Sequence, residues 1–151
     1  MVADMGALLQ SRGRSFGLVD VDWLGWFDVP GEPDVDHRVT LSNLRSICST
    51  YLEVGVRHLV LAWSIRDRAQ LDATRAAVGV PTTVVRLDVD EATVRARLGM
   101  DPTEERRTDD LAVALERLSR SQGVGIDDLE VPGTSPVREI STKICQRVGW
   151  V

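Results

Sequence analysis

The chain has 151 residues, a formal net charge of −5 and 43% hydrophobic residues, which suit one globular domain. No apolar run approaches the roughly 18 residues of a membrane span, and the acidic balance argues against nucleic acid as a partner. The first ten residues lack the basic start and long apolar stretch of a signal peptide, so we expect a cytoplasmic protein without a membrane segment. Cys48 and Cys145 have no CxxC spacing, which predicts buried thiols.

The first half of the chain is expected to alternate helices with buried strands. A short helix ends at the polar break of residues 10–14, and a buried strand follows over residues 15–21. Residues 23–33 are rich in Gly and Pro and predict a loop, before apolar residues at helical spacing predict a helix from about Asp36 to Glu53. A second buried strand is predicted over residues 57–63 and a helix over residues 64–78.

The second half continues the alternation. We expect a strand over 82–89, a helix that Asp90 caps, a charged connection over 101–107, a helix over 109–120, a strand over 129–131 and a final helix. Strands that are apolar on both faces and alternate with helices predict a single α/β domain over 1–151: a three-layer parallel sheet with helices on both faces. Ligands of such sheets bind at the carboxyl ends of the strands.

Acidic and aromatic residues follow the first predicted strand. Asp20 and Asp22 are two residues apart at its end, where they could share one side and bind a polar substrate or hold a base. The alternative is an Asp that caps the following turn. Trp23, Trp26 and Phe27 could form the wall of a substrate pocket, or simply pack beneath a loop.

Arginines gather around the charged connection, where Arg95, Arg97, Arg106 and Arg107 could bind phosphate through their planar guanidinium groups. The alternative is a solvated helix face paired with acids such as Glu91. The two histidines have no partner at metal-ligand spacing, so no metal site of the protein's own is expected. No GxSxG or comparable nucleophile motif is present, which argues against a serine or cysteine hydrolase.

The order of these pieces resembles the small-molecule kinases of the P-loop superfamily, such as adenylylsulfate kinase, gluconate kinase and chloramphenicol phosphotransferase. Residues 17–22 (GLVDVD) resemble the second strand with its acid-bearing end, and residues 58–63 (HLVLAW) resemble the third, at the Walker B position. Residues 84–87 and the helix with the arginines resemble the fourth strand and the approach to the lid. Residues 99–108 would form that lid, and residues 131–136 the loop against adenine.

The resemblance implies an ATP-dependent phosphotransferase that acts on a hydroxyl of a small molecule. It implies that Asp20 is the acceptor base or orienter and that Asp22 assists it. It implies that Trp23, Trp26 and Phe27 line the acceptor pocket. It implies that Arg97, Arg106 and Arg107 contact the transferred phosphate, and that Thr134, Ser135 and Pro136 lie against adenine.

The phosphate-binding apparatus of the superfamily is absent from this sequence. Its motif, GxxxxGK[ST], needs a Gly-Lys pair, and the one lysine, Lys143, lies in the last predicted helix. Ala62 and Trp63 stand where the Walker B acid is expected. Residues 1–13 resemble the helix that directly follows a P-loop, so the first strand, central in a 2-3-1-4-5 sheet, is missing. We therefore expect little or no kinase activity from the chain as written.

Three explanations of this gap remain open. The first in rank is a misassigned start, with roughly 15 to 25 upstream residues carrying the strand and the P-loop; only this form would use ATP and Mg²⁺. The second is a non-catalytic remnant that binds a ligand or protein, with its strands at His58 and Val84 paired directly. The third is a central strand supplied by another chain, which would make an oligomer.

Overall fold

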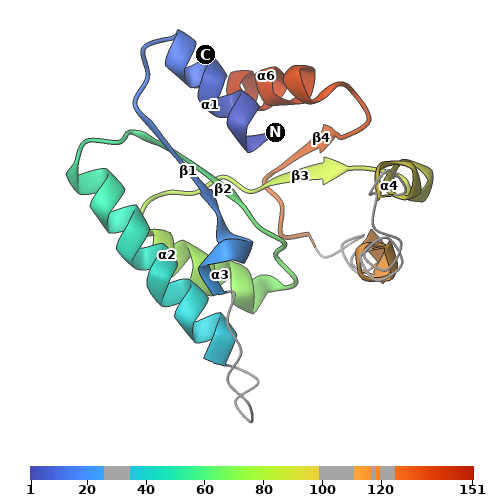
Figure 1. Ribbon diagram of the computed structural model, residues 1–151, viewed down its shortest axis with the longest axis horizontal. Helices are drawn as coiled ribbons and strands as arrows, with labels where there is room; N and C mark the ends of the chain where they lie inside the picture. The colour runs from blue at the N-terminus through green and yellow to red at the C-terminus, as the bar shows by residue number, and fades with distance from the viewer. Residues whose placement is uncertain (26–34, 99–110, 117, 120–124) are drawn as a thin grey trace.

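The computed structural model describes residues 1–25, 35–98, 111–116, 118–119 and 125–151 (Figure 1). Its labelled elements, in chain order, are α1 (Val2–Ser11), β1 (Phe16–Asp20), the 3-10 helix η1 (Val21–Gly25), α2 (Val35–Glu53), β2 (His58–Ala62), α3 (Arg68–Val78), β3 (Val85–Asp88), α4 (Glu91–Leu98), β4 (Leu129–Pro132) and α6 (Val137–Arg147). Residues 111–116 and 118–119 are also helical.

Where the structure describes the chain, the predicted helices and strands are present with shifted ends. The helix predicted from residue 64 begins only at Arg68, because the Asp67 carboxylate caps it and accepts a hydrogen bond from the Gln70 amide at 2.8 Å. The third strand is shorter than predicted and begins at Val85. Residues 21–25, partly predicted as loop, form η1 directly after β1.

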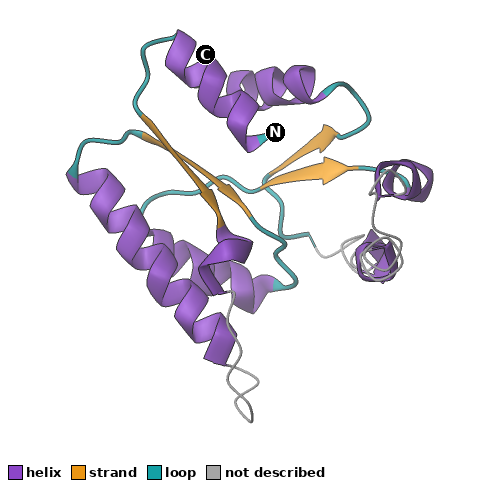
Figure 2. Ribbon diagram, viewed as in Figure 1, coloured by secondary structure: helices purple, strands orange, loops and turns teal. Residues whose placement is uncertain are grey.

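The strands form two separate parallel pairs (Figure 2). β1 pairs with β2, with Phe16 opposite His58, and β3 pairs with β4, with Val85 opposite Leu129. Within the described residues, no strand pairing joins β2 to β3. The predicted single sheet is therefore not formed, and the direct pairing of the strands at His58 and Val84 does not occur.

One hydrophobic cluster spans both strand pairs. Helices α1 and α6 lie side by side and contribute Leu9 and Ile144, which pack with Val60 of β2 and Val131 of β4. The first and last helices therefore cover the same face of both pairs (Figure 1).

The opposite face differs between the two strand pairs. On β1 and β2 it is apolar, and α2 and α3 cover it with residues that include Leu44 and Cys48. β1 approaches α2 so closely that a Cβ added to Gly17 would lie 2.4 Å from the Tyr51 ring. On β3 and β4 the residues in these positions form ion pairs instead, with Arg86 bonded to Glu130 of the neighbouring strand.

The two cysteine thiols are buried and free, as predicted. Burial raises the pKa of both Cys48 and Cys145 above the usual thiol value, so the neutral thiols contribute stability below that value. This stability is lost as the pH rises through the folded pKa. We expect both thiols to react with Ellman's reagent at neutral pH only after denaturation; fast reaction of the native chain at either thiol would contradict this.

Candidate functional site

The two predicted acids occupy the end of β1 in an arrangement that the spacing did not predict. Asp22 lies in η1 and not on the strand. The Asp20 carboxylate accepts a hydrogen bond from the Asp22 amide at 3.3 Å, so Asp20 caps the turn, as the alternative reading expected. Both side chains remain exposed at the carboxyl end of β1, where a ligand can reach them.

Of the three aromatic residues predicted to form the pocket wall, the structure describes only Trp23, which is 65% exposed and follows these acids in η1. Trp26 and Phe27 lie outside the described residues. η1 itself is tied to α2, because the Asn43 side-chain amide donates a hydrogen bond to the Leu24 carbonyl at 2.7 Å.

A second aromatic group at this end was missed by the sequence analysis. Trp63, directly after β2, stacks on His37 near the start of α2, with ring centroids 6.0 Å apart and an interplanar angle of 22°. The position of Trp63 at a strand's carboxyl end was the available signal. η1, Trp63 and His37 together frame the carboxyl end of the first strand pair.

Arg95 and Arg97 point to different sides of α4, as their spacing of two residues on a helix requires. The Arg97 guanidinium donates to the Gly133 carbonyl at 2.5 Å, so it lies against the loop predicted to contact adenine. Arg95 instead pairs with Glu91 one turn away, at 2.7 Å on the exposed surface of α4. α4 therefore aims one arginine at the carboxyl end of the second strand pair.

Arg106, Arg107 and the predicted lid over 99–108 lie outside the described residues.

The start of α4 is fixed as predicted. Asp90 accepts a hydrogen bond from the Thr93 amide at 2.7 Å. The Thr93 side chain, and then its amide, lower the pKa of the Asp90 carboxyl, so the cap is charged at neutral pH.

The loop after β4 is a tight, partly exposed turn. The Gly133 amide donates to the Asp88 carbonyl at 2.7 Å, and a Cβ on Gly133 would lie 2.6 Å from the Val89 side chain. Thr134 and Pro136 are exposed, and Ser135 is half-buried. The predicted adenine-side residues therefore lie on an accessible loop that Arg97 contacts at its first residue.

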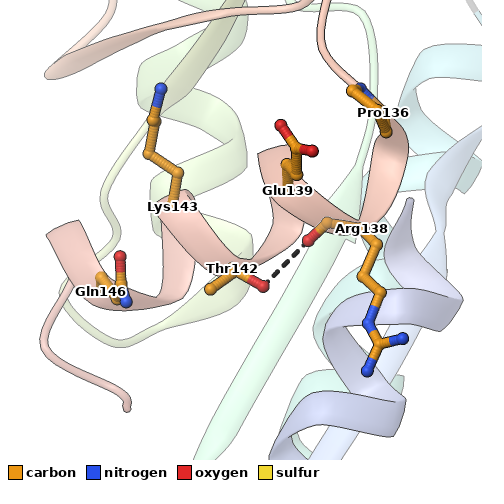
Figure 3. Close-up of a pocket in the computed structure, with 6 residues that line it drawn as sticks. All are labelled: Pro136, Arg138, Glu139, Thr142, Lys143 and Gln146. Atoms are coloured by element: carbon orange, nitrogen blue, oxygen red, sulfur yellow. Dashed lines mark hydrogen bonds between the residues drawn. The ribbon is translucent and has the colours of Figure 1, made fainter.

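A shallow depression on the outer face of α6 does not involve the carboxyl ends of the strands (Figure 3). Lys143 and Arg138 line it but point in different directions, and the Thr142 hydroxyl donates a hydrogen bond to the Arg138 carbonyl at 2.9 Å. Of the predicted site residues, only Pro136 lines this depression.

The residues present do not fit Mg²⁺ and the phosphates of ATP. The sequence has no Gly-Lys pair and no acid at Ala62 or Trp63. In the part of the chain that the structure describes, no three His, Cys, Asp or Glu side chains gather to hold a metal ion. Over the same part, no helix is long and apolar enough to cross a membrane.

Comparison with known proteins supports the fold. No protein-family profile and no curated protein sequence matches the chain significantly. Among solved structures, shikimate kinase from Aquifex aeolicus vf5 matches with a TM-score of 0.50 and 14% identity, over 97% of this chain and 88% of that chain. The chain therefore has a P-loop kinase-like α/β fold, and identity this low carries the fold alone.

Proposed function

We propose that the chain is a phosphotransferase of the P-loop kinase type that acts on a hydroxyl of a small molecule, and that these 151 residues do not transfer phosphate unaided. One observation carries the proposal. On a kinase-like fold, exposed acids lie at the carboxyl end of β1, while Arg97 lies at the end of the second strand pair.

The same reasoning explains why the chain alone is inactive. Positioning of the β and γ phosphates supplies most of the catalysis in phosphoryl transfer, and a phosphate-binding loop with its lysine does that work. No such loop is present in the sequence. ATP and Mg²⁺ are therefore used only together with a strand and a GxxxxGK[ST] segment from outside these residues.

In the complete site, each predicted residue has one role. Asp20 accepts the proton of the acceptor hydroxyl or orients it, and Asp22 assists. Arg97, with Arg106 and Arg107 of the lid, stabilises charge on the transferred phosphoryl group. Trp23, Trp26 and Phe27 line the acceptor pocket. Thr134, Ser135 and Pro136 line the adenine side.

The test compares the chain alone with the chain carrying a strand and a GxxxxGKS segment ahead of Met1. With Mg-ATP and a panel of small-molecule alcohols that begins with shikimate, we expect ADP release only from the extended chain. Saturation at a hundred times Kd should raise its melting temperature by roughly 5 to 10 °C, from about 2.7 kcal/mol of binding linkage.

The control is the extended chain with the added lysine replaced by alanine, which should lose the phosphate positioning and the turnover. Turnover by the unextended chain, or none by an extended chain that binds Mg-ATP, would contradict the proposal.

The second candidate function is a binding module without catalysis. The exposed Trp23 favours it, as do the edges of β2 and β3 with which no described strand pairs. An extended chain that melts cooperatively but shows no shift with Mg-ATP would favour this function over phosphotransfer.

A further inference from the structure

The loop that leaves β2 holds an arginine at the carboxyl end of the first strand pair. β2 ends at Ala62, opposite Asp20 of β1, and the chain then runs through Arg66 into α3 (Figure 1). Arg66 is exposed, so solvent and ligands have access to its guanidinium group. Because ligands of parallel α/β sheets bind at the carboxyl ends of the strands, this loop belongs to the same candidate site as Asp20.

A buried amide fixes this arginine. The Gln70 side chain of α3 is only 6% exposed, and its oxygen accepts hydrogen bonds from the Arg66 amide at 2.8 Å and from Arg66 Nε at 3.4 Å. A buried amide group is costly unless it is hydrogen-bonded, so Gln70 and Arg66 hold each other in place. The Gln70 backbone amide donates in turn to the Asp67 carboxylate at 2.8 Å, which ties the loop to the first turn of α3.

The terminal nitrogens of the Arg66 guanidinium are left for a ligand. The bond to Gln70 uses only the N–H on Nε. Within the described residues, no other acceptor is bonded to this guanidinium and no carboxylate forms an ion pair with it. Arg68, two residues later, is by contrast bonded to the Gly125 carbonyl at 3.1 Å. Two guanidinium nitrogens side by side match two oxygens of a carboxylate or a phosphate.

We propose that Arg66 binds an acidic group, a carboxylate or a phosphate, on the small molecule that occupies the carboxyl end of the first strand pair. This role rests on the proposed function, because that molecule is then the acceptor alcohol. The acceptor is thus an anion, bound through Arg66 at its acidic group and through Asp20 at its hydroxyl. Asp20 and Asp22 alone would repel an anion, and Arg66 supplies positive charge that offsets this repulsion.

The test titrates the isotope-labelled 151-residue chain, without ATP, with three related alcohols: glycerol, glycerate and glycerol 3-phosphate. All three carry a hydroxyl, but only the last two carry an acidic group. We expect both acids, at millimolar concentration, to shift the NMR signals of Arg66 Nε–H and of the amides of residues 64–67 until they saturate. Glycerol should leave these signals unchanged. The acid that binds more tightly identifies the group as a carboxylate or a phosphate.

Three variants, followed at the amides of the loop, assign the binding to Arg66. Arg66→Gln should weaken binding of the acids at least tenfold, because it removes the charge and the paired donors. Gln70→Met keeps the side-chain volume but removes the acceptor, and should weaken binding by about threefold because Arg66 is no longer held. Arg57→Gln is the matched control, since Arg57 is exposed directly before the other end of β2, and should leave binding unchanged. If Gln70→Met fails to fold, Arg66→Gln, at an exposed position, still decides the question.

Equal shifts with glycerol and with the acids, or no shift with either acid, would overturn this role of Arg66. Equal losses for Arg66→Gln and Arg57→Gln would also overturn it, because binding would then be a nonspecific attraction of anions. None of these results depends on phosphate transfer. An extended chain that phosphorylates only neutral alcohols would contradict the role of Arg66 and leave the proposed function intact. Acids that bind through Arg66 to an extended chain without turnover would contradict the proposed function alone.

Discussion

Replacing Asp20 by asparagine is expected to lower phosphorylation of the acceptor by more than tenfold in the chain extended with a phosphate-binding segment. The reason is chemical, because the amide cannot take the proton of the hydroxyl as a carboxylate can. The fold should survive, since an asparagine oxygen can still accept the Asp22 amide hydrogen that now caps η1. Initial rates at saturating acceptor and Mg-ATP measure the effect.

The controls separate loss of the base from loss of the turn. Asp22→Asn should reduce the rate less, and the melting temperature of Asp20→Asn, with and without Mg-ATP, should match that of the unsubstituted extended chain. Turnover by Asp20→Asn at a tenth of the original rate or more would remove Asp20 from its assigned role.

Truncation of Leu44 to alanine is expected to destabilise the chain by about 2 to 5 kcal/mol. Leu44 is fully buried in the middle of α2, in the cluster that α2 and α3 form on β1 and β2. Its removal costs the transfer energy of the lost methyl groups and leaves a cavity that a close-packed core fills only in part. Urea denaturation followed by circular dichroism gives the change in free energy of unfolding.

Leu52→Ala is the matched control on the same helix. Leu52 is 36% exposed near the end of α2, so the same chemical change removes less buried surface and should cost less than about 1 kcal/mol. Equal losses for the two variants would mean that the cluster around Leu44 is not a packed core.

The elements of the fold were predictable from local patterns. Buried strands were recognised because apolar residues such as those of 58–62 are continuous, and helices because apolar residues recur at the helical period. The resemblance to P-loop kinases gave the order of the strands in the sheet, and the structural match supports the fold. The hydrophobic pattern alone predicted one continuous sheet, because hydrophobic periodicity does not specify which strand edges meet. Only the resemblance, with its missing central strand, is compatible with the two strand pairs that the structure describes.

The candidate site was predictable by position and not by contact. The position of Asp20 and Trp23 after a predicted strand indicates a ligand site there. A carboxylate that binds a ligand and one that caps a turn have the same sequence pattern, however. The contact of Arg97 with Gly133 and the stack of His37 on Trp63 join residues far apart in the chain. Only the tertiary structure brings these residues together, so their contacts could not be predicted from local sequence spacing.

The two hydrophobic clusters become complete at different points of synthesis. Every buried residue of the cluster beneath α2 and α3 lies between Val19 and Val78, so it can form once that stretch has left the ribosome. The other cluster joins Met5 to Cys145. α1, with ten residues, is too short to be stable by itself; β1 and β2 cover part of its apolar face, and α6 covers the rest. A chaperone that binds the nascent chain would therefore find the α6-facing side of α1 exposed until α6 has been made.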